Sequence, residues 1–81
     1  VRQVVYQAER VVAAGETLRL AQRQLDAERA RLAEGLSTNF VVLQFQQDLA
    51  TAESSERRAR VDYMKALAAL AAARGVIGEV P

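Results

Sequence analysis

Apolar residues recur every seven positions in two long runs of this sequence, and this period constrains the fold more than any other feature. The first run consists of Val4, Val11, Leu18, Leu25 and Leu32. The second consists of Val42, Leu49, Tyr63, Leu70 and Ile77, with Glu56 at its one polar position. A seven-residue repeat places its members along one stripe of an α-helix, and that stripe is buried when it packs against another helix. The sequence therefore predicts two long helices joined by a coiled-coil seam.

The two runs are separated by the stretch Gly35-Leu36-Ser37-Thr38-Asn39. Gly35 is suited to the left-handed conformation that ends many helices. Ser37, Thr38 and Asn39 each carry a side chain that can accept a hydrogen bond from the free N–H groups of a new helix. We therefore predict an all-α fold, a long antiparallel two-helix coiled-coil hairpin that forms a single unit over residues 1–81. Its helices span residues 2–34 and 40–74, its turn spans 35–39, and glycines at the end lead into an extended tail, 75–81.

The residues three positions after each heptad residue of the second run are mostly small. They are Phe45, Ala52, Ala59, Ala66 and Ala73. Small residues at these positions let the axes of the two helices approach closely. If the chain folds back about Ser37, the numbers of facing residues sum to about 74, so Leu25 lies near Leu49 and Val11 near Tyr63. Glu56 then faces Leu18. Because an unpaired buried charge is costly, we expect its carboxylate to reach Arg19, Arg60 or water.

Several large apolar residues fall outside the predicted seam, namely Val5, Val12, Leu20, Leu43, Val61 and Leu67. Two rods joined along one seam bury little apolar surface, so these residues require neighbours. A compact three- or four-helix bundle would use them equally well. For the chain by itself we expect self-association as a dimer of two hairpins.

The charged residues and the missing residue types limit the possible functions. Eleven basic and ten acidic residues leave a net charge of +1, which gives no basic surface for nucleic acid. Six pairs of opposite charge stand three or four residues apart and predict solvated helix surfaces: Glu16-Arg19, Asp26-Arg29, Glu28-Arg31, Glu53-Arg57, Glu56-Arg60 and Asp62-Lys65. Cysteine and histidine are absent, and the serines have no base to activate them. We therefore predict that the chain is not an enzyme and has no catalytic residue, cofactor or metal site.

The turn and its flanks resemble a known family. The stretch from Arg31 to Leu43, RLAEGLSTNFVVL, followed by Gln46-Gln47-Asp48-Leu49 and the later Tyr63, is similar to the TolC-type outer membrane efflux factors. In that family a glycine, an apolar residue and a Ser or Thr form the turn of a long helical hairpin. The resemblance covers nearly all of the chain. It implies a fragment of a longer protein, placed near the C-terminus of its parent by the ending Arg74-Gly75-Val76-Ile77.

The resemblance also implies a location and partners. Family members are homotrimers located in the cell outer membrane, and they build a periplasmic helical tunnel together with a β-barrel that would lie outside this segment. Their hairpin turns dock on a periplasmic adaptor protein. Carried over to this chain, the docking tip consists of Gly35, Leu36, Ser37, Thr38 and Asn39. The sequence departs from the family at Val41 and Gln44, where members often have acidic residues. The loss at Val41 removes the reciprocal capping bond and puts an acidic ring at the tunnel mouth in doubt.

Two functions remain open at this point. The chain is either one hairpin of an efflux duct or a hairpin interaction module, from an adaptor or a scaffold, that acts by dimerisation. Leu36 distinguishes the two, because a plain connecting turn is usually polar throughout. We expect Leu36 to dock on a partner; the alternative is that it folds back against Leu32 or Phe40.

Overall fold

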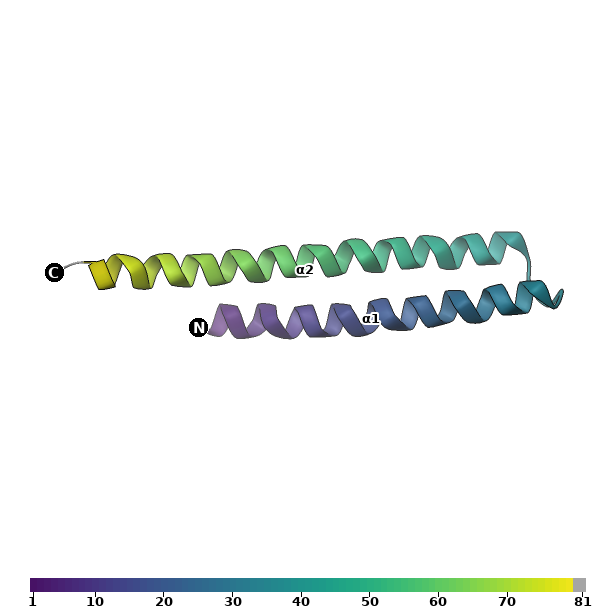
Figure 1. Cartoon of the computed structure of the whole chain (residues 1–81), viewed down its shortest axis with the longest axis horizontal. Coiled ribbons are helices and arrows are strands. Elements are labelled where there is room, and N and C mark those ends of the chain that lie inside the picture. Colours follow the sequence, from purple (N-terminus) through teal and green to yellow (C-terminus); the bar gives the residue numbers. More distant parts are fainter. Residues whose placement is uncertain (80–81) are drawn as a thin grey trace.

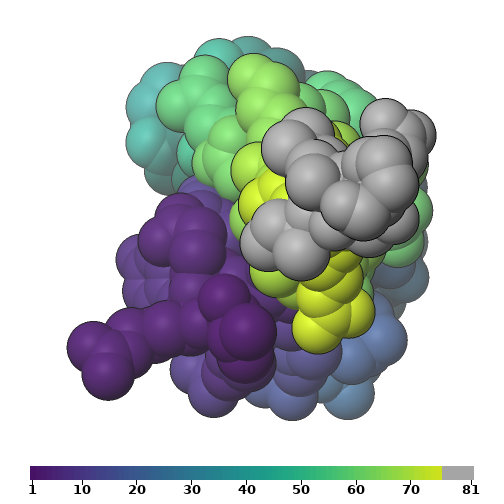
Figure 2. All heavy atoms as spheres, turned by 90° about the vertical axis from the view of Figure 1, so that its left-hand side faces the viewer, coloured from purple at the N-terminus to yellow at the C-terminus, as the bar shows by residue number. Residues whose placement is uncertain are grey.

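The computed structural model describes the backbone of residues 1–79 and the side chains of residues 1–75. Helix α1 spans Arg2–Ala33 and helix α2 spans Asn39–Glu79. The two run antiparallel and form a rod of 71 × 14 × 13 Å (Figure 1). Seen from its open end, the rod consists of these two helices packed against each other (Figure 2). The prediction of an all-α helical hairpin is confirmed.

The buried residues of the hairpin lie at the predicted heptad positions or three residues after them, which together form the seam. They are Gln7, Ala21, Leu25 and Glu28 in α1 and Val42, Ala52, Glu56 and Ala59 in α2. Leu25 and Ala59 are the most enclosed, with exposed fractions of 3% and 2%. The remaining heptad residues from Val4 to Leu70 are half-buried. The seven-residue period therefore identifies the contact stripe of both helices.

Each of the three polar residues buried in the seam has an arginine beside it. Gln7 Oε1 accepts a hydrogen bond of 2.8 Å from Arg10 Nη1. Glu28 Oε1 accepts one of 3.1 Å from Arg31 Nε. Glu56 forms an ion pair with Arg60, as the sequence predicted. In the part of the chain whose side chains are described, no buried side-chain polar atom lacks a partner. The seam thus holds polar groups without leaving one unsatisfied.

One ion pair between the helices indicates their register. Arg10 Nη1 lies 3.0 Å from Asp62 Oδ2. These residues directly precede Val11 and Tyr63, the pair predicted to face each other, so the register is close to the predicted one and not a heptad away. The proximity of Leu25 to Leu49 stays a prediction. Of the six predicted surface pairs, Glu28–Arg31 and Glu56–Arg60 form ion pairs within the described side chains, whereas Asp62 pairs with Arg10 instead of Lys65.

The boundaries of the elements differ from the predicted ones, most of all at the end of α2. The chain leaves α1 one residue early, at Ala33, and α2 begins at Asn39, which the sequence assigned to the turn. The prediction that the second helix ends at residue 74 is wrong, because α2 continues through Gly75 to Glu79. A glycine within a helix lowers its stability by only about 1 kcal/mol relative to alanine. A helix can therefore end at a glycine or continue through it. Residues 80–81 of the predicted tail lie outside the described residues.

The continued helix extends beyond its partner. At the open end α2 projects past the start of α1 (Figure 1). Residues 71–75 are exposed, including Ala73, which the heptad pattern placed in the seam. Ala73 is exposed because α1, which begins at Arg2, does not extend far enough along the rod to cover it. A heptad position is buried only where the other helix is present.

The hairpin exposes more surface than a compact protein of its size. Its accessible surface is 6184 Å², whereas a compact monomer of 8.9 kDa exposes about 4,800 Å². All six apolar residues predicted to lie off the seam are exposed, with fractions from 39% for Leu67 to 61% for Val12. The prediction that these residues lie off the seam is therefore confirmed.

Gly15 lies in the middle of α1 and offers a direct test of helix stability. A Cβ atom added at this position meets nothing within 4 Å. We expect Gly15→Ala to raise the free energy of unfolding by about 1 kcal/mol, because alanine loses less backbone entropy in a helix. Urea denaturation followed by far-ultraviolet circular dichroism measures the change. A loss of stability would contradict the open space found at Gly15.

Candidate docking site at the hairpin tip

Gly35 ends α1 through a backbone conformation that favours glycine. Its φ is +77°, and it is the one positive φ among the described residues. The Gly35 N–H donates to the Leu32 carbonyl oxygen at 3.0 Å, and the Leu36 N–H donates to the Arg31 carbonyl oxygen at 2.8 Å. These two bonds form the Schellman motif, which satisfies the carbonyls left free at a helix end. The predicted left-handed role of Gly35 is confirmed.

Thr38 begins α2. Its Oγ1 accepts a hydrogen bond of 3.2 Å from the Val41 N–H. Of the three candidate caps, Thr38 is therefore the one that bonds to the new helix, whereas Ser37 is half-buried in the turn and Asn39 is the first helical residue. The side chain of Val41 cannot return a bond to Thr38, and the first turn of α2 contains no acidic residue. The positive end of the α2 dipole is thus left without a carboxylate.

The backbone of Leu36 is held on both sides, while its side chain faces solvent. The Leu36 N–H bonds to the Arg31 carbonyl, and the Leu36 carbonyl oxygen accepts a bond of 3.1 Å from Arg31 Nη2. The same Arg31 also donates to Glu28. The side chain of Leu36 is nonetheless 60% exposed. Folding back against the hairpin therefore does not bury this side chain, and Leu36 is presented from a fixed turn.

Phe40 and Leu43 extend the exposed apolar surface next to the turn. Phe40 is 68% exposed and Leu43 is 51% exposed. We refer to Leu36, Phe40 and Leu43 as the tip patch. Phe40 is not one of the residues that the family resemblance assigns to the docking tip. Its position is informative, since the Cα–Cβ bonds of a helix tilt toward its N-terminus and side chains in the first turn of α2 therefore lean toward the tip.

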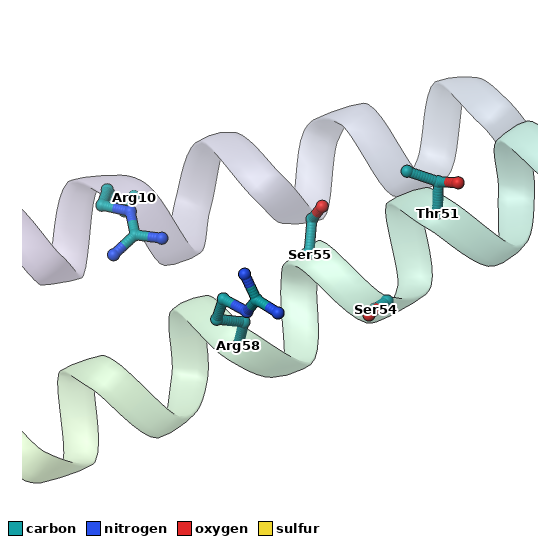
Figure 3. Close-up of a pocket in the computed structure, with 5 residues that line it drawn as sticks. All are labelled: Arg10, Thr51, Ser54, Ser55 and Arg58. Atoms are coloured by element: carbon teal, nitrogen blue, oxygen red, sulfur yellow. The ribbon is translucent and has the colours of Figure 1, made fainter.

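A polar groove lies on the rod, far from the tip patch. It is a groove of about 430 Å³ lined by Arg10, Thr51, Ser54, Ser55 and Arg58 (Figure 3). The Arg10 guanidinium is already bonded to Gln7 and Asp62. A hydroxyl nucleophile requires a neighbouring base, and none of the five lining residues is one at neutral pH. The groove is a polar side of the rod, made of hydroxyl and guanidinium groups.

A metal-binding cluster and a helix able to cross a membrane are both absent from the described residues. No group of three or more histidine, cysteine, aspartate or glutamate side chains is arranged to hold a metal ion there. Neither described helix contains a stretch with the length and hydropathy needed to cross a bilayer. Among the described features, the tip patch combines exposed apolar side chains with a backbone held by specific bonds. It is the candidate functional site.

The chain matches no protein-family model, and neither a curated protein nor a solved structure is significantly similar to it. The similarity to the TolC-type efflux factors therefore rests on the residues of the turn and its flanks.

The left-handed conformation of Gly35 leads to a prediction about the turn. Although a Cβ at this position has open space around it, the φ of +77° is unfavourable for alanine. We expect Gly35→Ala to lower the free energy of unfolding by about 1 kcal/mol, the reverse of the effect at Gly15. The two variants are compared by urea denaturation under identical conditions. Equal effects of the same sign would show that Gly35 does not require its conformation.

Proposed function

We propose that the chain is a periplasmic helical hairpin of an outer membrane efflux duct of the TolC type, and that its tip docks on a periplasmic adaptor protein. In this proposal the parent protein is a homotrimer and the hairpin contributes to the wall of its tunnel. Substrates pass through the tunnel that the hairpins enclose, and the hairpin itself performs no chemical step. Its docking residues are Gly35, Leu36, Ser37, Thr38 and Asn39, to which we add Phe40 and Leu43 of the tip patch.

One observation carries the proposal: two large apolar side chains, Leu36 and Phe40, are more than half exposed at the end of a rod 71 Å long. An apolar group in this position has little of its own chain to cover it, so its burial requires a partner. The bonds that the Gly35 and Leu36 N–H groups donate to the carbonyls of Leu32 and Arg31 hold the turn before any partner binds. Such preorganisation lowers the entropy lost on docking.

The second candidate function is an interaction module that acts by dimerisation. The surface along the rod favours it, because Val5, Val12 and Met64 are also exposed and lie far from the tip. The two functions differ in the role of the tip. A dimerisation module uses the long sides of the rod, whereas a duct hairpin also requires its turn.

Substitution of Leu36 in the full-length parent protein tests the proposal. We expect Leu36→Asp to abolish efflux and cross-linking to the adaptor, while trimer yield and thermal stability barely change. Leu20→Asp is the matched control, since Leu20 is 49% exposed but lies in the middle of α1. If Leu36→Asp lowers stability while adaptor binding survives, the docking role is wrong.

A further inference from the structure

An apolar groove runs along α1 near the open end of the hairpin. It measures about 460 Å³ and is lined by Val4, Val5, Ala8, Glu9, Val12, Ala13 and Glu16. Val5 and Val12 are 52% and 61% exposed. Every lining residue belongs to α1, so the groove is open to solvent along its length.

α2 adds to the same side of the rod. The apolar residues of α1 on this side follow seam residues by one or four positions. Val5 and Ala8 follow Val4 by one and four residues, and Val12 follows Val11 by one. Met64 and Leu67 occupy the equivalent positions after Tyr63, and they are 66% and 39% exposed. We refer to these five residues as the apolar side. The polar groove and the Arg10–Asp62 pair include residues that directly precede seam residues, and they mark the opposite side of the rod.

We infer that the apolar side binds a second copy of this chain, stacked with its tip at the same end, so that α1 of each copy lies on α2 of the other. The inference concerns a long side of the rod and does not depend on the function proposed for the tip. It gives the expected dimer a defined surface and orientation.

The heights of the residues along the rod support this orientation. Arg10 and Asp62 are in contact through their side chains and therefore lie at similar heights. Counting from this pair along the antiparallel helices, Val5 lies close to the height of Leu67 and Ala8 lies close to that of Met64. In the stacked dimer these heights are kept between copies. The apolar residues of α1 in one copy thus meet those of α2 in the other.

The charges beyond the apolar residues select the same orientation. By the same count Glu16 lies within one residue of the height of Arg57, and Arg19 is level with Glu53. Within the described side chains, none of these four forms an ion pair in its own hairpin. Stacking with the tips together brings opposite charges to the same height between copies. With the tips at opposite ends, α1 lies on α1 and α2 on α2, so neither the Glu16–Arg57 pair nor the Arg19–Glu53 pair can form between copies.

The available surface is sufficient for such an interface. The hairpin exposes roughly 1,400 Å² more than a compact monomer of its mass. A stable interface of standard size buries about 800 Å² on each partner. The dimer therefore needs about half of this additional surface. Because the interface lies along the side of the rod, the tip patch stays free.

Charge exchange between two variants tests the arrangement. We expect Glu16→Arg or Arg57→Glu alone to weaken the wild-type dimer about tenfold, because two symmetry-related pairs change from attraction to repulsion. An equimolar mixture of the two variants restores both attractions in the heterodimer. Native mass spectrometry of the mixture should therefore show the heterodimer well above the statistical half.

Arg58→Glu is the matched control, because it makes the same charge change one residue away on the polar side. It should leave the dimer constant nearly unchanged, and circular dichroism should show equal helix content for all variants. Three results would each overturn the inference: a wild-type monomer at tens of micromolar in sedimentation equilibrium, statistical pairing in the mixture, or equal weakening by Arg58→Glu and Arg57→Glu.

Disulfide formation gives a second, independent readout, since the chain has no native cysteine. A mixture of the Ala8→Cys and Met64→Cys variants should form a disulfide between copies under mild oxidation, and Ala8→Cys alone should not. Linkage of Ala8→Cys with itself would place α1 on α1 and contradict the proposed orientation.

Discussion

Replacing Leu25 with alanine is expected to lower the free energy of unfolding by about 3 kcal/mol. Leu25 is 3% exposed and is the most enclosed large side chain in the seam. Truncation removes the apolar contacts of Leu25 and leaves a cavity between the two helices. The helices cannot close this cavity fully, because the seam on either side of it holds them apart. Urea denaturation at a fixed protein concentration measures the loss.

Leu20→Ala provides the control for this prediction. Leu20 lies five residues earlier in the same helix and is 49% exposed. We expect its truncation to change the free energy of unfolding by less than about 0.5 kcal/mol. Similar losses at positions 20 and 25 would contradict the seam, since they would show that burial within the hairpin does not decide stability.

Enlarging Ala59 is expected to destabilise the hairpin by about 2 kcal/mol. Ala59 is the most enclosed residue of α2, with an exposed fraction of 2%. Leucine is a good helix former, so Ala59→Leu leaves helix propensity nearly unchanged and tests packing alone. The added atoms must separate the helix axes or adopt a strained rotamer.

The matched control is Ala68→Leu, at an exposed position of the same helix. Thermal denaturation of the two variants should give a lower midpoint for Ala59→Leu and little change for Ala68→Leu. An unchanged or raised midpoint for Ala59→Leu would mean that the small residues of the second run do not set the distance between the helices.

The seam and the turn could be predicted from the sequence because both depend on local rules. A seven-residue repeat fixes which side of a helix is apolar, and it identified Leu25, Val42 and Ala59 correctly. Gly35 and Thr38 take part in short-range bonds whose partners lie within five residues in the chain. Such bonds depend little on the rest of the fold.

Other features depend on the whole hairpin and were missed or misplaced. Gly75 does not reveal where α2 ends, because a glycine is compatible with both a helix and a helix stop, and α2 continues past it to Glu79. Ala73 is exposed because α1 does not reach it, which the pattern of α2 alone cannot show. Phe40 lies outside the heptad seam, so periodicity gives it no role, and its exposure beside Leu36 becomes evident only once the turn is folded.

The proposed function requires that the tip patch contacts an adaptor protein. The most direct measurement places a photo-crosslinking amino acid at position 36 of the full-length parent protein in living cells, with the same substitution at position 20 as the comparison. We expect irradiation to yield a covalent product with the periplasmic adaptor from position 36 and little from position 20. Equal yields from both positions, or no adaptor product from position 36 when the trimer is intact, would contradict the claim.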